Sequence, residues 1–191
     1  MLGTALPFVL IIGTWLVDGE LLHSISGYYH SSLRDIYVGT MCAVGVFLLF
    51  YRGYACSDWL ASIVAGIAAI GVALFPIPAG GPIVEDAVGM LHLVFAVVLF
   101  GAFAYFCLVE FPKSGAIRVT ARKMRRNQVY RVTGLIIVAC LALVAVVELI
   151  GGFDHLRPVL WLEAIATVAF GVAWLTKGEA ILGDPAPSSV R

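Results

Sequence analysis

Charged side chains are scarce in this sequence: 13% of its 191 residues are Asp, Glu, Lys or Arg, about half of the roughly 25% typical of soluble domains. Hydrophobic residues make up 61% of the chain, and the mean hydropathy is +1.00. A soluble fold of this length cannot bury so much apolar surface. The composition therefore excludes a soluble globular protein and indicates a chain embedded in a membrane.

Short signatures of catalysis and metal binding are also missing. The four cysteines stand in or beside apolar runs without CxxC spacing, which argues against a disulfide framework or a cysteine metal site. Neither an HExxH metal motif nor a GxSxG nucleophile motif occurs. The first apolar run has no basic segment before it and leads into Asp18 and Glu20, so we expect a retained membrane helix and no cleaved signal peptide.

Six apolar runs are present, separated by polar, basic or Pro- and Gly-rich connections. At 1.5 Å per residue each is long enough to cross about 30 Å of hydrocarbon. We therefore predict an all-α polytopic bundle of six transmembrane helices, a domain over 1–182, followed by a disordered cytoplasmic tail at 183–191. The predicted helices cover about 5–22, 36–51, 59–78, 88–110, 132–151 and 158–176.

The basic residues predict the orientation of this bundle. Seven of them, and no acid, lie in the connection 112–131, and basic residues near helix ends are retained in the cytoplasm. With six spans, both termini and ten of the twelve Lys and Arg residues are then cytoplasmic, which leaves Arg34 and Arg157 outside. We expect a multi-pass protein of the plasma membrane, of the bacterial inner-membrane type.

The same topology gathers all four histidines and eight of the twelve acids at the outer face. His92 and Glu163 lie inside apolar runs at similar depth, where an ionisable group costs several kcal/mol and normally faces the bundle interior with a partner. We therefore predict that these two side chains lie within hydrogen-bond or single-water reach of each other. If the protein is an enzyme, its expected catalytic residues are His92, Glu163, Asp35 and His23, with Asp18 nearby.

Three kinds of chemistry fit this layer, and the sequence leaves them open. Imidazoles and a carboxylate can hold Zn²⁺ and leave a position for water, and His23, His92 and Asp35 are the candidate ligands. A His and a Glu with shifted pKa can instead act as general acid and base or relay a proton. In the third interpretation, His92 and Glu163 form a polar lock that hydrogen-bonds two helices together.

Basic side chains predict contacts with membrane lipids and not with nucleic acid. Four arginines of the cytoplasmic connection recur at i, i+4, i+7 and i+8, a helical face suited to anionic inner-leaflet lipid: Arg118, Arg122, Arg125 and Arg126. On the outer side, Arg34 is the candidate partner of a phosphate headgroup. Alternatively Arg34 pairs with Asp35, or Asp35 caps the helix that follows it.

The third run carries a stripe of small residues. Ala65, Ala69 and Ala73 recur at four-residue intervals, with Gly66 and Gly71 beside them. Small side chains let two helix backbones approach closely in a membrane. The stripe therefore predicts a close helix–helix contact.

Three short motifs connect the chain to known membrane proteins. They are Ser24-Ile25-Ser26-Gly27 after the first helix, Leu91-His92-Leu93 opening the fourth, and Trp161-Leu162-Glu163 opening the sixth. In these motifs the chain resembles the Frag1/DRAM/Sfk1 group and the related DUF998 bacterial membrane proteins, although the Ser-Asp pair typical of those families is Ser26-Gly27 here. The resemblance implies a six-helix membrane architecture and, through the eukaryotic members, an association with lipid-anchor remodelling and autophagy. A weaker likeness to ceramidase-like hydrolases implies zinc chemistry.

The leading hypothesis is an integral membrane protein that binds or processes lipid at the outer leaflet. The alternatives are a zinc-dependent membrane hydrolase, a proton-coupled transporter and a structural partner subunit. A bound metal would favour the hydrolase, and a continuous polar path would favour the transporter. The second and third runs contain no ionisable residue at mid-membrane depth, which argues against an ion path.

Overall fold

The computed structural model describes residues 2–53, 56–79, 86–113 and 120–183. All regular elements in these ranges are helical, and no strand occurs there, which confirms the all-α prediction. The long helices are α1 (Leu2–Val17), α2 (Arg34–Phe50), α3 (Cys56–Leu74), α4 (Ala87–Tyr105), α5 (Ala121–Ile150) and α6 (Pro158–Lys177). The short segments are the 3-10 helices η1 (Ser26–His30) and η4 (Asp154–Leu156), and the π-helix η3 (Phe106–Glu110), which continues α4.

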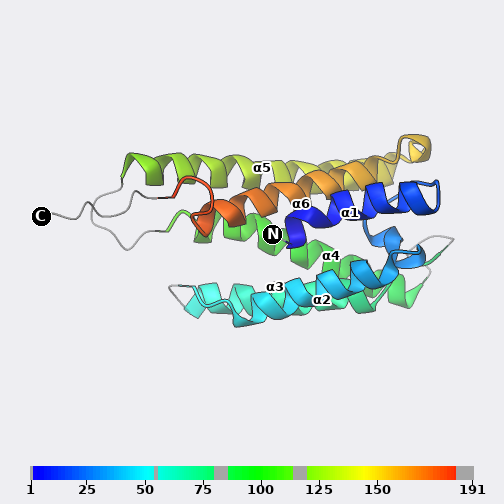
Figure 1. Cartoon of the computed structure of the whole chain (residues 1–191), viewed down its shortest axis with the longest axis horizontal. Coiled ribbons are helices and arrows are strands. Elements are labelled where there is room, and N and C mark those ends of the chain that lie inside the picture. Colours follow the sequence, from blue (N-terminus) through cyan, green and yellow to red (C-terminus); the bar gives the residue numbers. More distant parts are fainter. Residues whose placement is uncertain (1, 54–55, 80–85, 114–119, 184–191) are drawn as a thin grey trace, which may run out of the picture.

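The long helices run along one common direction and close into a ring. Each helix packs on its neighbour in chain order, and α1 packs on α6. Figure 1 shows α1, α5 and α6 in one layer, α2 and α3 in another, and α4 between them. The backbones of α4 and α6 approach each other at few points across the ring, and the cavity described below lies between them.

Four helical segments of the described chain are long and apolar enough to cross a membrane. Their outer surfaces are apolar too, since Leu149 of α5 is 86% exposed and Trp161 of α6 is 47% exposed. Exposing such surface to water costs about 25 cal/mol per Å², so the bundle is embedded in a membrane, as the composition predicts. The segments are Ser57–Leu74, Ala87–Glu110, Ala121–Ile150 and Pro158–Lys177, while the apolar part of α1, Gly3–Val17, is shorter.

Two helices end earlier than their apolar runs. Helix α1 ends at Val17 and not near 22, because Gly19 adopts the left-handed conformation (φ +72°) that terminates helices. Helix α3 ends at Leu74 and not near 78, because Pro76 lacks an N–H and disfavours helical backbone at the residue before it. The predicted runs were extended past these points by Leu21 and Leu22 in the first case and by Phe75 and Ile77 in the second.

Helix α5 begins at Ala121, eleven residues before the predicted start at 132. The Thr120 side chain caps it by accepting a hydrogen bond from the Lys123 backbone N–H at 3.1 Å. Arg, Lys, Met and Gln are good helix formers, so the helix continues through the basic segment. Hydropathy located the apolar part of α5 and not its amino-terminal end.

The small-residue stripe of α3 packs as predicted. Ala65, Ala69 and Ala73 are fully buried. At the crossing with α2, a methyl group added to Gly45 would lie 2.9 Å from the Gly66 carbonyl oxygen, and one added to Gly66 would lie 2.8 Å from the Gly45 carbonyl oxygen. The two backbones therefore meet at a pair of glycines.

Some predicted features lie outside the described residues. They include Arg118 of the basic face, most of the external connection 79–87, and the tail 183–191 apart from Gly183.

Candidate functional site

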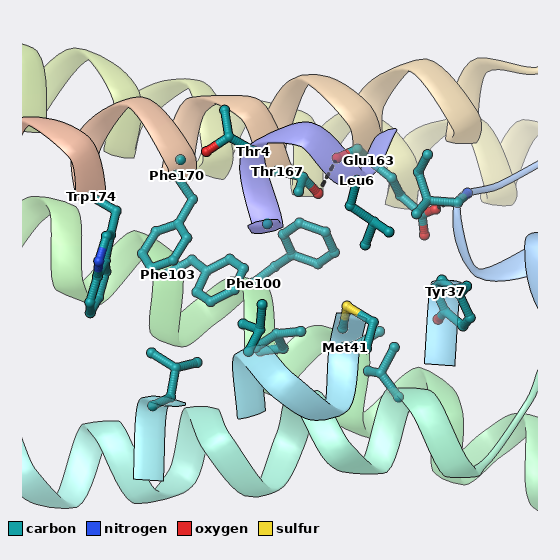
Figure 2. A pocket seen from close by; sticks show the side chains of 18 of the residues that line it. Thr4, Leu6, Tyr37, Met41, Phe100, Phe103, Glu163, Thr167, Phe170 and Trp174 are labelled. Atoms are coloured by element: carbon teal, nitrogen blue, oxygen red, sulfur yellow. Dashed lines mark hydrogen bonds between the residues drawn. The ribbon is translucent and has the colours of Figure 1, made fainter. Parts of the chain in front are cut away.

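A cavity of about 470 Å³ occupies the centre of the helix ring. Its lining comes from α1, α2, α3, α4 and α6, and from the connection that follows α1. Figure 2 shows Tyr37 and Glu163 toward one end of this space and Trp174 at the other. Pockets of this size hold small organic ligands, so the cavity is the candidate functional site.

The first end of the cavity is polar, and Glu163 is its charged group. The backbone N–H of Ile25 donates to Glu163 Oε2 at 2.7 Å. Thr167, one turn further along α6, donates its hydroxyl to the Glu163 carbonyl at 2.8 Å (Figure 2). A carboxylate offers about four acceptor sites, so Glu163 retains capacity for further donors from the cavity.

The connection 24–30 closes this polar end. Ser24 Oγ accepts from the Gly27 N–H at 2.9 Å, which forms the turn that leads into η1. Ser24, Ile25, Ser26 and Tyr28 are all buried. Because Glu163 accepts from Ile25, the carboxylate holds this connection against α6 across 138 residues of sequence.

Tyr37 is the second polar group that the cavity meets. It projects from α2, is 1% exposed, and lines the cavity with Ser26. Among the described residues its hydroxyl has no hydrogen-bond partner, and Ser26 lies near it without hydrogen-bond geometry. A buried hydroxyl without a partner costs about 1–3 kcal/mol, so a ligand that bonded to Tyr37 would remove a real penalty.

The opposite end of the cavity is aromatic. The rings of Phe103 and Phe170 stack with centroids 3.7 Å apart and planes 5° apart. Trp174 packs edge-on against Phe47 at 5.5 Å and against Tyr51 at 5.0 Å. The cavity is therefore amphipathic, with hydrogen-bonding groups at one end and closely packed rings at the other.

His92 is buried, as predicted, but it does not bond to Glu163. It is 4% exposed, and its Nδ1–H donates to the carbonyl of Phe75, just past the end of α3, at 2.6 Å. His92 therefore satisfies an orphan carbonyl at a helix end and locks α4 to α3. The polar lock was expected to join His92 to Glu163; instead His92 bonds to Phe75 and Glu163 accepts from Ile25.

His30 has the same kind of partner. Its Nε2–H donates to the carbonyl of Ile77, two residues beyond the carbonyl that His92 binds. Both carbonyls precede a proline in the turn after α3. Two of the four histidines thus stabilise one turn.

The other outer candidates are at the surface and are not drawn together. His23 and Asp35 are exposed. Arg34 donates to the hydroxyl of Tyr29 and stacks over its ring, with the guanidinium carbon 4.3 Å from the centroid. Helix α2 has Leu33 at its N-cap and no side-chain cap, so Asp35 does not cap it and Arg34 contacts Tyr29.

The described residues do not assemble the proposed zinc site. Across these ranges, no three His, Cys, Asp or Glu side chains converge in a way that could hold a metal ion. His92 is committed to Phe75, while His23 and Asp35 are exposed. The geometry of His23, His92 and Asp35 therefore does not fit Zn²⁺.

The basic face at the opposite end of the bundle divides into exposed and buried arginines. Arg125 is exposed, and Arg122 is exposed but donates to the carbonyl of Gly183. Arg126 is 7% exposed and donates to Glu179 Oε1 at 3.1 Å and to the Leu182 carbonyl at 3.2 Å. The expected headgroup role is therefore wrong for Arg126, which ties α5 to the segment after α6.

A buried ion cluster at the same end was not predicted. Asp58 and Glu110 are 2% and 4% exposed, and Lys113 Nζ donates to one oxygen of each at 2.8 Å. These two carboxylates raise the pKa of Lys113 above its ordinary value. The sequence does show Asp58 and Glu110 at the borders of two apolar runs. It does not show that Lys113 pairs with both, because that depends on how α3 and η3 pack together.

Comparison of the chain with family models, curated proteins and solved structures finds no match.

Proposed function

We propose that this protein crosses the plasma membrane, of the bacterial inner-membrane type, with six helices and binds a lipid-like amphiphile in its central cavity. The observation that carries the proposal is the cavity itself, about 470 Å³ of largely apolar space with Glu163 and Tyr37 at one end. An amphiphile in a bilayer also has an apolar body and a polar end. The cavity complements both parts.

The case for six spans rests on α1 and α2, which join the four long apolar helices in the same ring. With 16 and 17 residues they are about 24 and 26 Å long, close to the length needed to span. Their outer side chains are apolar: Trp15 is 58% exposed, and Phe50 is 81% exposed. Such faces fit hydrocarbon.

The orientation with both termini in the cytoplasm is part of the proposal and follows from the positive-inside rule. Cysteines placed at Ser31 and Gln128, in a chain without the native cysteines, test it through labelling of intact cells with an impermeant reagent. We expect labelling at Ser31 and none at Gln128. The reverse pattern would overturn the orientation.

Ligand binding is favoured over catalysis by the chemistry of the cavity wall. Among the described lining residues, Glu163 and Tyr37 are the titratable side chains. Metal chemistry needs further ligands, and His92 and His23, which were the expected acid–base and zinc residues, do not line the cavity. Membership of the Frag1/DRAM/Sfk1 and DUF998 group stays a prediction that agrees with a lipid ligand.

Filling the cavity tests the function. Ala96 lines the cavity from α4, so Ala96→Phe is expected to occupy part of it, whereas Ala142→Phe adds the same ring on the exposed face of α5. Lipids retained by the purified full chain after detergent washing are extracted and quantified by mass spectrometry. We expect about one retained amphiphile per chain in the wild type and in Ala142→Phe, and a loss in Ala96→Phe. Equal retention in all three proteins would refute binding in this cavity.

A further inference from the structure

The size of the cavity limits the ligand. An engineered apolar cavity of about 150 Å³ binds one benzene, which has six heavy atoms. The cavity of about 470 Å³ is three times larger and therefore accommodates roughly 18 heavy atoms. A lipid with one chain of about sixteen carbons therefore matches this volume, whereas a two-chain phospholipid of more than twice that size would extend out of the cavity, which is partly open.

The direction of such a chain follows from the arrangement of the wall. Glu163 and Trp174 both lie on α6, eleven residues apart, which is about 16 Å along the helix axis. Figure 2 shows them toward opposite ends of the cavity, with Phe100 and Phe103 between them. A ligand with its polar group near Glu163 therefore places the far end of its chain near Trp174.

The polar end does not suit an anionic headgroup. No Lys, Arg or His is found among the described residues that line the cavity. Glu163 is negative when ionised, and the charged neighbour that acts on it is another acid, Glu148. A carboxylate or phosphate placed there would face like charge in a low-dielectric site without a counter-ion.

The two titratable side chains of the wall, Glu163 and Tyr37, instead favour a ligand group that is both a donor and an acceptor. In its ionised form Glu163 only accepts hydrogen bonds, so a ligand group that donates complements it. Tyr37 has a buried hydroxyl without a partner among the described residues, and it lies close enough for Glu163 to act on it electrostatically. A hydroxyl can donate to Glu163 and accept from Tyr37, whereas an ammonium group can only donate.

We infer that the ligand of this cavity is a lipid alcohol with one chain, whose hydroxyl lies between Glu163 and Tyr37 and whose chain extends toward Trp174. This inference rests on the proposed function and specifies its ligand class. In this arrangement the aromatic end of the cavity selects the length of the lipid chain. The polar end of the cavity selects a neutral hydroxyl.

Quenching of tryptophan fluorescence by brominated chains tests the inference on the full-length protein in detergent. The wild type has four tryptophans, so Trp15, Trp59 and Trp161, which are all exposed, are replaced by Phe to leave Trp174. The probes are hexadecanol, hexadecanoate and hexadecylamine, each with bromine on its last carbon, at a pH where the acid is ionised. Hexadecanol with bromine beside the hydroxyl is the positional control.

We expect saturable quenching of Trp174 by hexadecanol brominated at the far end, little quenching by the positional control, and at least tenfold weaker binding of hexadecanoate. Glu163→Gln and Tyr37→Phe, checked for fold by gel filtration and circular dichroism, are each expected to weaken binding of the alcohol at least fivefold. The comparison of hexadecanol with hexadecanoate uses a protein with native Glu163 and Tyr37. It therefore tests the preference for a hydroxyl even if a variant does not fold.

Each alternative outcome has a separate meaning. Equal or tighter binding of hexadecanoate overturns the headgroup assignment but leaves lipid binding in the cavity standing. Tighter binding of hexadecylamine overturns the hydroxyl in favour of a cation. Absence of saturable Trp174 quenching with every probe refutes the proposed function itself.

Discussion

The crossing of α2 and α3 allows a stability prediction with an internal control. A Cβ at position 45 would lie 2.6 Å from Ile70 Cγ1 and 2.9 Å from the Gly66 carbonyl oxygen. Ile70 can change rotamer, but the carbonyl belongs to the backbone of α3 and moves only if the helix moves. Gly45→Ala therefore forces the two helices apart, and overpacking of this kind costs about 1–3 kcal/mol.

Gly39 supplies the control because it lies on the same helix and a Cβ there meets nothing within 4 Å. Replacing glycine by alanine in a helix gains at most about 0.5–1 kcal/mol from backbone propensity. Gly39→Ala should therefore be neutral or slightly stabilising. The Gly45→Ala variant should be less stable than the Gly39→Ala variant by the whole cost of overpacking at the crossing.

The assay is thermal stability of the purified protein in one detergent, followed by gel filtration of the fraction that stays folded. We expect the midpoint of Gly45→Ala to fall by several degrees below that of Gly39→Ala. Gly66→Ala should behave like Gly45→Ala, because its Cβ meets the Gly45 carbonyl oxygen at 2.8 Å. Equal midpoints for Gly45→Ala and Gly39→Ala would show that the helices do not meet at these glycines.

Three further predictions concern the ends of the bundle. His92→Ala removes the donor from the part-buried hydrogen bond to the Phe75 carbonyl and should cost about 0.5–1.5 kcal/mol, yet leave amphiphile binding intact. Lost binding at unchanged stability would contradict this. Arg126→Ala removes part-buried charge-assisted hydrogen bonds and should cost about 1–2 kcal/mol after solvent screening at the half-exposed Glu179. Exposed Arg125→Ala should change stability by less than about 0.5 kcal/mol. Because the pKa of Lys113 is raised in the folded protein, its ion pairs stabilise the fold fully below the unfolded-state pKa of about 10.4. This stabilisation is lost as pH rises through the higher folded-state pKa. The alkaline fall in thermal midpoint should thus be smaller in Lys113→Gln, and an identical pH profile would contradict the ion cluster.

The sequence predicted the helical class and the approximate helix positions because apolar runs of this length have few other structures in a bilayer. Helix ends depended on local chemistry that hydropathy ignores. Gly19 ends α1 and Pro76 ends α3 before the ends of the runs that predicted them. Helix α5, in contrast, extends beyond its apolar run, because Thr120 caps a helix that begins well before the apolar part.

The pairing of His92 with Glu163 failed for a different reason. Counting residues from a helix end gives depth, at 1.5 Å per residue, and the two side chains were correctly judged to be at similar depth along their helices. The direction in which each one points depends on the 100° step between residues and on which helices are neighbours. Helix α4 directs His92 toward the end of α3, while α6 directs Glu163 toward Ile25 and the cavity.

The cavity could not be predicted from residue types, because its wall consists of ordinary membrane residues. Phe100, Phe103 and Phe170 would equally well fill a packed core. The space lies where the backbones of α4 and α6 stay apart, and it is bounded at one end by the stacked rings of Phe103 and Phe170. Of the polar groups at its end, the sequence singled out Glu163 but not Tyr37, because nothing in the sequence distinguishes a tyrosine that lines a cavity from one packed in an apolar run.

Glu163 has two tasks, and its hydrogen bond to Ile25 separates them. The carboxylate holds the connection 24–30 over the polar end of the cavity, and it also faces the space where a ligand hydroxyl would lie. Glu163→Ala removes both functions, so its loss of binding would not distinguish an open connection from a missing ligand contact. Glu163→Gln keeps an oxygen that can accept from the Ile25 N–H but removes the negative charge. It should therefore retain the closed connection, measured as unchanged resistance to proteolysis at 18–33, while its discrimination between hexadecanol and hexadecanoate falls. If Glu163→Gln discriminates as strongly as the wild type, the charge of Glu163 does not select the headgroup, and its task is confined to closing the cavity.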